Sequence, residues 1–483
     1  MLKRIKVENF KSLKLLDYPC AKLNLLMGVN GAGKSSFVQL MLLMRNLAQQ
    51  KLQASNLLET EGSSGVGRYE DLRYCYAGAS DLVKFNVQFA PRGNIAVCMH
   101  GDKHLDIDAL YMMFPLDPRE TDVAADTVFS ISRVLKRDKD ANHVLRLYDS
   151  KYVEELLSSS ELKTMVDYRE KYGDDKLDEN GEPTEYVEVE GAFIKKRKEL
   201  STRYDAVASK VDPYFRLLWR NMKIVDAFRK KPSQVHSGGR HDKAEWLSRN
   251  VGFCPEGDDV IEFLWNVGSE VMLDEDNPML FPDSKGERRL IDQVNAWLQV
   301  VSPGASIQVD RKTVAQSERF VQSVAFGHGS SERSHKPQNV GFGISYVLPV
   351  LVALLSSVPE DIVIIENPEA HLHPRGQAEM GNLIARAAAY GIQVFVETHS
   401  DHVINGVRVA VKKGIVKPDD VNIAFFERKG HEIIADDGTK HKEYYADVRN
   451  IKIDDKGSLS EYPEDFMDEW NNQLLRLMKP RTK

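Results

Sequence analysis

The sequence predicts an α/β fold built around a parallel sheet, with the two halves of that fold at opposite ends of the chain. Near the N-terminus the apolar stretch 23–27 runs into a glycine-rich turn, and a helical apolar pattern starts at Ser36. Within residues 338–405, the apolar runs Asp361–Ile365 and Ile392–Val396 flank an alanine-rich stretch with helical spacing. Strands that alternate with helices are typical of parallel sheets, because a helix returns the chain between neighbouring parallel strands.

The length and composition indicate a multidomain globular protein. The 483 residues exceed what one hydrophobic core usually organises, so we expect two or three domains. No stretch approaches the ~20 apolar residues of a membrane span, and no secretion signal opens the sequence. The four cysteines form no Cys-x-x-Cys pair, which favours reduced thiols in a cytoplasmic protein. A net charge of −7 argues against a uniformly basic nucleic-acid binder.

Residues 1–100 are expected to form the first half of this α/β fold, called the head below. The alternating run Ile5–Val7 and the apolar stretch 23–27 predict two strands before the first helix. A second alternating run, Val83–Phe89, predicts an antiparallel β region at about residues 55–100.

Three further parts are expected to follow. Residues 101–325 should form a mainly helical insertion, because most of their periodic stretches have helical spacing. These stretches are 152–172, 193–228 and 291–301. Residues 326–430 should hold the second half of the head, which includes the apolar helix Val347–Leu355. Residues 431–483 should form a small polar C-terminal domain.

A glycine-rich loop predicts a phosphate-binding site. Gly28 to Ser35 fits the pattern G-x-x-x-x-G-K-[ST] between a strand and a helix. Glycines let backbone N–H groups converge on phosphate oxygens, and the helix N-terminus adds the positive end of its dipole. Lys34 would reach the β- and γ-phosphates, and the Ser35 hydroxyl would ligate Mg²⁺. The residues expected to contact nucleotide here are Gly28, Asn30, Gly31, Gly33, Lys34, Ser35 and Ser36.

Two strand ends in the second half predict the rest of this site. The run 361–365 ends at Glu366, which therefore lies at the carboxyl edge of a parallel sheet, where ligands bind. Glu366 can hold Mg²⁺ there. The second run ends in Glu397-Thr398-His399, and a histidine at this position can contact the γ-phosphate or orient the attacking water.

These motifs resemble those of ABC-type ATPases of the RecF, SMC and overcoming-lysogenization-defect branch. The matching segments are Ile5–Ser12, Gly28–Ser35, Glu366–Pro374 and Glu397–His402. Within that branch the chain is similar to bacterial ATPases with a short C-terminal domain, here at about 444–478. The resemblance is strong over 1–45 and 338–405 and weak between them.

The resemblance implies an ATPase with ATP and Mg²⁺ as cofactors. His399 would be the switch histidine. The segment 339–345 would stand in for the ABC signature, with Gly341, Gly343 and Ser345 contacting the nucleotide of a second subunit. ATP would then close a head-to-tail dimer or a larger oligomer, and hydrolysis would release it. Glycines at a helix N-terminus also make an anion-binding nest on physical grounds.

One position departs from the family pattern. Such ATPases usually end the strand Asp-Glu-Pro, where the glutamate is the general base, but this chain has Glu366-Asn367-Pro368. Asn367 can position a water but cannot take its proton. Either hydrolysis is slow, or Glu369 supplies the carboxylate from the next turn.

A basic segment, residues 195–243, leaves two readings open. It contains fourteen Lys and Arg residues against five acidic ones, interleaved with aromatics. It could follow a nucleic-acid backbone, or it could be a solvated helix or protein interface whose aromatics face the core.

The resulting hypothesis is a regulatory ATPase that dimerises around ATP and controls a separately encoded nuclease or toxin in anti-phage defence. The last step rests on analogy with relatives. Two alternatives remain: a repair or maintenance ATPase that acts directly on DNA, and a scaffold that holds ATP with little turnover. Membrane binding is not expected.

Overall fold

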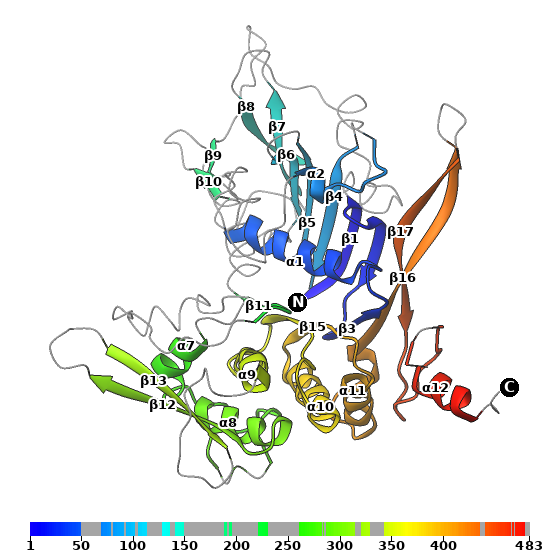
Figure 1. Cartoon of the computed structure of the whole chain (residues 1–483). Helices are drawn as coiled ribbons and strands as arrows, with labels where there is room; N and C mark the ends of the chain where they lie inside the picture. Colours follow the sequence, from blue (N-terminus) through cyan, green and yellow to red (C-terminus); the bar gives the residue numbers. More distant parts are fainter. Residues whose placement is uncertain are drawn as a thin grey trace.

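The computed structural model describes a fold made of two large β-sheets with helices packed around them (Figure 1). The described residues are 1–49, 69–78, 81–90, 93–101, 105–113, 128–135, 141–148, 188–190, 193–195, 221–229, 260–282, 284, 286–313, 320–328, 342–434, 440–464, 466–467 and 469–478.

The central sheet has six strands in the order β11-β14-β15-β3-β16-β17. Their bounds are β11 Met222–Val225, β14 Ile362–Glu366, β15 Gln393–Glu397, β3 Leu23–Gly28, β16 Val421–Ile434 and β17 Lys440–Ile451. All neighbours pair in parallel except β16 and β17, which form an antiparallel hairpin. The carboxyl ends of β14, β15 and β3 therefore meet at one edge, although β3 comes from the opposite end of the chain.

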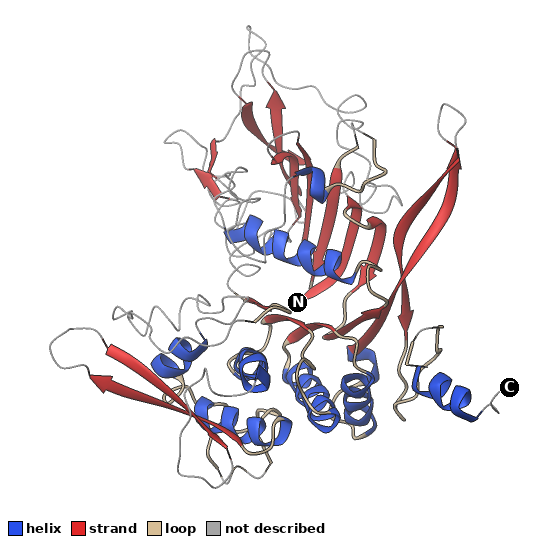
Figure 2. Cartoon of the chain, viewed as in Figure 1, coloured by secondary structure: helices blue, strands red, loops and turns tan. Residues whose placement is uncertain are grey.

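Helices cover both faces of the central sheet, as Figure 2 shows. The helix α1 (Lys34–Gln49) follows β3 and lies on one face. The helices α9 (Phe342–Leu355), α10 (Pro374–Tyr390) and α11 (Asp401–Lys412) lie on the other. This confirms the predicted α/β class with a parallel sheet between helical layers.

The alternation within β15 shows why its sequence is an unbroken apolar run. Val394 and Val396 belong to the core beneath α9 to α11. Phe395 faces the opposite side, where its ring centroid lies 6.0 Å from that of Phe37 in α1. Because both faces of the strand are buried, no polar position interrupts it.

The second sheet has seven antiparallel strands in the order β2-β1-β4-β5-β6-β7-β8. Their bounds are β1 Leu2–Phe10, β2 Leu13–Pro19, β4 Val83–Phe89, β5 Gly93–Gly101, β6 Leu105–Met113, β7 Val128–Leu135 and β8 Ala141–Tyr148. The helix α1 joins this sheet to the central one, since Phe37 also packs on Tyr18 of β2 with ring centroids 4.8 Å apart.

Smaller elements complete the described chain. They are α2 Tyr69–Leu72, β9 Glu188–Glu190, β10 Phe193–Lys195, α7 Val260–Val267, α8 Leu290–Val301, β12 Ala305–Thr313, β13 Phe320–His328, the 3₁₀ helix η3 Pro418–Asp420 and α12 Glu469–Met478. The pairs β9–β10 and β12–β13 each form a separate two-stranded sheet. None of the described helices is long and apolar enough to cross a membrane.

The expectation of a mainly helical insertion at 101–325 is wrong for much of the described part. Strands β6, β7 and β8 continue the antiparallel sheet, whereas α7 and α8 lie only near the C-terminal end. In the stretch 193–228, expected to be helical, β10 and β11 are strands. Pairing with neighbouring strands decides these positions, and the local spacing does not encode it. The stretch 152–172 lies outside the described residues.

The expected boundaries at 100/101, 325/326 and 430/431 each fall inside a strand, namely β5, β13 and β16. The C-terminal part is also more than a polar appendage, because β16 and β17 continue the central sheet. The division of the chain into four functional parts stays a prediction.

Candidate functional site

The glycine-rich loop between β3 and α1 lies at the carboxyl edge of the central sheet. Lys34 opens α1 and is 3% exposed, and its Nζ donates to the carbonyl oxygens of Gly28 at 2.8 Å and Val29 at 3.0 Å. Burial lowers the pKa of Lys34, while the negative charge of Glu397 opposes that shift. The ammonium group is thus held inside the loop in the place where phosphate oxygens would compete for it.

Two of the loop glycines are required by the β16–β17 hairpin. Gly28 has φ 132°, and a Cβ there would lie 2.1 Å from the carbonyl oxygen of Phe426 in β16. Gly33 has φ 111°, and a Cβ would lie 2.6 Å from the Cβ of Ala446 in β17. The hairpin therefore packs directly on the phosphate loop, a constraint that the motif alone does not reveal.

The two serines after Lys34 point to different neighbours. The Ser35 hydroxyl donates to Glu397 Oε1 at 3.1 Å, across 362 positions of sequence. The Ser36 hydroxyl lies 2.9 Å from that of Ser12, in the turn between β1 and β2. Asn30 and Gly31 are exposed at the tip of the loop. The structure thus places Ser35 toward the strand ends and ties Ser36 to the antiparallel sheet.

Glu366 and Glu397 stand side by side at the ends of β14 and β15, because they are partners in the parallel register. Burial, together with the charges of Glu397 and Asp226, raises the pKa of Glu366 to about 8, while the charge of Arg229 opposes this shift. Burial also raises the pKa of Glu397, opposed by Lys34 and the Ser35 hydrogen bond. Neighbouring carboxylates with raised pKa values are typical of sites that receive a cation.

Glu369 and His399 meet beside this pair. One oxygen of Glu369 accepts a hydrogen bond from the Thr398 hydroxyl at 2.8 Å, and the other accepts from the His399 backbone N–H at 3.0 Å. His399 as a whole residue is exposed. Burial of part of the ring and the charge of Lys34 lower its pKa, while Glu369 raises it. Glu369 therefore positions the turn that carries His399.

Asn367 occupies a constrained turn after β14. Its φ is 45°, its N–H donates to the Glu397 carbonyl at 2.8 Å, and its buried Oδ1 accepts no hydrogen bond from the described residues. A buried amide oxygen without a donor is suited to receive one from a water molecule.

The proposed signature segment lies only partly within the described residues. Gly341 falls outside them, whereas Gly343 and Ser345 lie in the first turns of α9. A Cβ on Gly343 would approach the His371 carbonyl oxygen to 3.3 Å, and Ser345 is 2% exposed. The role of these residues toward the nucleotide of a second subunit stays a prediction.

Sequence reasoning passed over two residues of this site. In the sequence Glu397 stands out only as part of the strand-end motif, although its carboxylate contacts Ser35 in the structure. Arg229 belongs to the basic segment in the sequence, yet it is 5% exposed and contacts the turn after β14. Its neighbour Phe228 is 73% exposed. Most of the segment 195–243 lies outside the described residues, so its nucleic-acid reading stays a prediction.

The oxygen-rich composition of the site fits Mg²⁺. The Ser35 hydroxyl and the Glu366 and Glu397 carboxylates are hard oxygen donors, which Mg²⁺ prefers. In the described part of the chain no group of three or more His, Cys, Asp or Glu side chains is arranged to hold a metal. A Mg²⁺ ion here would take further ligands from phosphate and water, as is usual for this ion.

Comparison with protein families places both halves of this site among ATPase domains. The family described as "AAA domain, putative AbiEii toxin, Type IV TA system" matches residues 125–405. The AAA ATPase domain family matches residues 1–229, and a family described as protein of unknown function, DUF3696, matches 416–477. These matches confirm the resemblance to ATPases of the RecF and SMC branch. No curated protein matches the chain in sequence.

Solved structures that are similar to this chain include three SMC heads. The Smc head bound to the C-terminal winged-helix domain of ScpA has a TM-score of 0.38 and 11% identity, covering 93% of this chain and 98% of that one. A Pyrococcus furiosus Smc head with an extended coiled coil, bound to the C-terminal domain of ScpA, has a TM-score of 0.40 and 13% identity, covering 99% of both chains. The Thermotoga maritima SMC head has a TM-score of 0.32 and 9% identity, covering 94% and 99%.

Proposed function

Because the chain belongs to the AAA-domain family described as a putative AbiEii toxin of a type IV toxin–antitoxin system, we propose that it binds and hydrolyses ATP as a conformational switch. The observation that carries this proposal is the 3.1 Å contact between the Ser35 hydroxyl and Glu397. It joins the phosphate loop of the N-terminal half to the strand ends of the C-terminal half. One nucleotide could therefore be held by both ends of the chain.

The residues divide into a binding group and a hydrolytic group. The loop Gly28–Gly33 and Lys34 would hold the phosphates, while Ser35, Glu366 and Glu397 would hold Mg²⁺. Bound Mg²⁺ would neutralise charge that develops on the phosphates. The carboxylates would then be ionised, because a cation favours their charged form.

Around the attacking water, Asn367 would accept a hydrogen bond through its free Oδ1. His399 would contact the γ-phosphate, and Glu369 would act by fixing His399 through the N–H contact at 3.0 Å. Both oxygens of Glu369 are already engaged, which favours this positioning role over direct proton abstraction.

The same observations support a dimer that forms around ATP. The nucleotide loop lies at an open edge, with Asn30, Gly31 and Ser35 exposed. A second subunit could cover this edge with the N-terminus of α9, where Gly343 lies. ATP binding would close the dimer and hydrolysis would reopen it. A partner, such as a separately encoded nuclease or toxin, would respond to this change in conformation. The extension of this proposal to anti-phage defence rests on analogy with relatives alone.

ATP binding and phosphate release of the purified chain test the proposal. Wild type should bind MgATP and release phosphate, and Lys34→Ala should lose binding because the loop loses its ammonium group. Lys22→Ala is the matched control, since Lys22 pairs with Asp420 at the opposite end of β3 and should leave both activities unchanged. ATP binding by Lys34→Ala at wild-type affinity would refute the assignment.

The dimer is tested separately by light scattering with a non-hydrolysable ATP analogue and Mg²⁺. Wild type should double its mass and Lys34→Ala should not. If the mass of wild type is the same with and without the ATP analogue, the proposed dimer is refuted. The proposal that the chain binds ATP would not be affected by that result.

One observation favours a second candidate function, an ATP-holding scaffold. Asn367 stands where a carboxylate base is usual, and an amide cannot accept the proton of water. Stable ATP-bound dimers with negligible phosphate release would establish this reading in place of the switch.

A further inference from the structure

Arg229 is a buried cation at the edge of the candidate site. It follows β11, the outermost strand of the central sheet beside β14, and it is 5% exposed. Burying a guanidinium is costly unless its N–H groups find acceptors, so the contacts that it makes show what it holds.

The acceptors of Arg229 within the described residues are main-chain carbonyl oxygens of three elements. Nε donates to Asp226 O at 2.8 Å, and Nη1 donates to Tyr346 O of α9 at 2.7 Å. Nη2 donates to Glu366 O and, at 3.4 Å, to Asn367 O. The rigid fork of the guanidinium thus fastens the turn after β14 to α9 and to the end of β11.

This turn needs such a fastening. Asn367 has φ 45°, a left-handed conformation that is unfavourable for a non-glycine residue unless its surroundings hold it. Its N–H is bound to β15 through Glu397 O, so Arg229 holds the same turn from the opposite side. The direction of the Asn367 amide and of the Glu366 carboxylate depends on both attachments.

We propose that Arg229 is a positioning residue for ATP hydrolysis, which fixes the Glu366–Asn367 turn against the first turns of α9 without touching nucleotide. This inference rests on the proposed ATPase function. It also links α9, whose N-terminus would face a second subunit, to the turn that carries the hydrolytic residues.

The charge of Arg229 supports the same role. Burial lowers its pKa to about 10, so it stays protonated at neutral pH. Its charge also lowers the pKa of Glu366, against the repulsion from Glu397 and Asp226. A neutral residue at position 229 would lose the hydrogen bonds to the carbonyl oxygens. It would also lose the positive charge that opposes the repulsion of Glu366 by Glu397 and Asp226.

Phosphate release and ATP affinity of Arg229→Ala and Arg229→Lys form the test. We expect kcat to fall by about 10- to 100-fold, because small misplacements of catalytic groups cost that much. ATP affinity should change by less than about threefold, since the phosphate loop is untouched. Guanidinium chloride at low millimolar concentration should restore part of kcat in Arg229→Ala, and Arg229→Lys should stay impaired because an ammonium lacks the fork.

Lys223→Met provides the matched control for lost stability. Lys223 is equally buried, lies on β11, the strand that Arg229 follows, and pairs with Asp361 at the opposite end of β14. The Lys223→Met variant should be less stable than wild type, but kcat of its folded fraction should be unchanged. Guanidinium chloride should have no effect on its kcat. Wild-type kcat in Arg229→Ala, or equal losses of kcat in Lys223→Met, would overturn the positioning role alone. Absent phosphate release by the wild type would refute the proposed function as well.

Discussion

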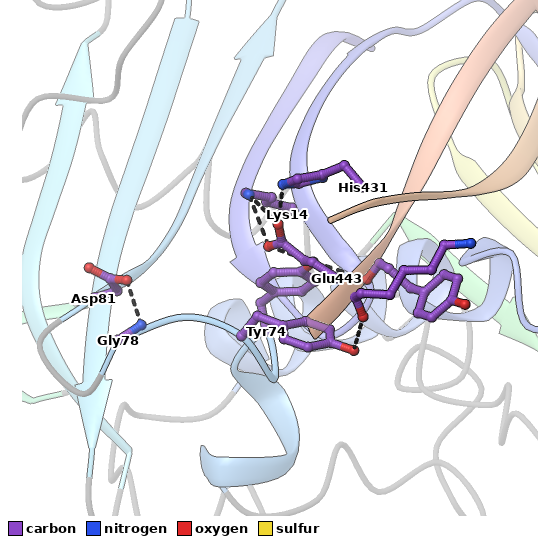
Figure 3. A network of polar contacts seen from close by, with 9 residues as sticks. Lys14, Tyr74, Gly78, Asp81, His431 and Glu443 are labelled. Atoms are coloured by element: carbon purple, nitrogen blue, oxygen red, sulfur yellow. Dashed lines mark hydrogen bonds and ion pairs between the residues drawn. The ribbon is translucent and has the colours of Figure 1, made fainter. Parts of the chain in front are cut away.

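Replacing Glu443 by glutamine should loosen the β16–β17 hairpin from the body of the protein. Glu443 is 3% exposed in β17 and joins three other parts of the chain (Figure 3). Lys14 Nζ lies 2.9 Å from both carboxylate oxygens, the Tyr74 hydroxyl donates at 3.0 Å, and His431 Nε2 lies at 2.7 Å. Because the hairpin also packs on the phosphate loop, the carboxylate stabilises the surroundings of the candidate site.

The size of the effect follows from these contacts. Glutamine keeps one carbonyl oxygen, but its NH₂ group would face donors that need an acceptor. A hydrogen bond to a charged group is worth about 1.5–3 kcal/mol when buried. The Lys14 side chain is 43% exposed, so water can replace part of the interaction that its ammonium group loses. We therefore expect the free energy of opening the hairpin to fall by about 2 kcal/mol.

Native-state hydrogen exchange of the β17 amides measures this opening directly. Glu432→Gln is the control on the same hairpin, because Glu432 is 70% exposed and its pair with Lys440 spans 3.6 Å. That variant should change the opening free energy by less than about 0.5 kcal/mol. If Glu443→Gln also stays within this limit, the buried carboxylate does not fasten the hairpin.

The pH dependence gives the effect a second signature. Burial alone would raise the pKa of Glu443, but hydrogen bonds from Lys14 and Tyr74 and the charges of Lys14 and His431 leave it below its usual value of 4.5. A carboxyl with a depressed folded pKa stabilises the protein above its unfolded pKa, and this stabilisation is lost as the pH falls through the folded pKa. The difference between wild type and Glu443→Gln should therefore be full at pH 7 and shrink below about pH 4.5.

Three more predictions concern the central sheet and its helices. The pKa of Glu366 is raised to about 8, so the nucleotide-free protein should lose stability as the pH rises from about 4.5 to 8. Glu366→Gln should therefore have a higher melting temperature than wild type, and the difference should be larger at pH 8 than at pH 5. Equal differences in melting temperature at the two pH values would contradict this. Gly406→Ala would place a Cβ 2.1 Å from the Ala378 carbonyl oxygen and force α10 and α11 apart. The free energy of unfolding should fall by about 1–3 kcal/mol, and an unchanged thermal midpoint would disprove this. Asp361→Asn leaves the buried Lys223 ammonium without its carboxylate partner. The free energy of unfolding in urea should fall by about 3–5 kcal/mol. A fall of less than about 1 kcal/mol would show that the oxygens of Ser356 and Ser357 are enough to stabilise the buried ammonium.

The parts of the fold that sequence reasoning predicted share one property: each is determined by local pattern. The runs that became β3, β14 and β15 are apolar because both faces of the strand are buried. The helix α1 starts at Lys34, where the glycines end, and α10 starts at Pro374, which suits the first turn of a helix. These signals lie within a few residues of the elements that they predict.

The elements that were missed depend on distant partners. Strands β6, β7 and β8 are antiparallel neighbours that extend the sheet begun by β1, and their pairing supplies hydrogen bonds that no local spacing announces. The short strand β11 is held by its parallel pairing with β14, about 140 positions later. Contacts over such separations are properties of the folded chain.

The sequence by itself determined the chemistry of the site: a phosphate loop ending in Lys34 and Ser35, a carboxylate at a strand end, and a histidine after the next strand. These are short patterns whose geometry follows from backbone rules. The tertiary structure alone decided which carboxylate faces Ser35, that Glu369 fixes His399, and that Arg229 is buried at the turn after β14. It did so because groups that are 30, 137 and 362 positions apart in these three contacts come within hydrogen-bond distance only when the parallel sheet aligns its strand ends.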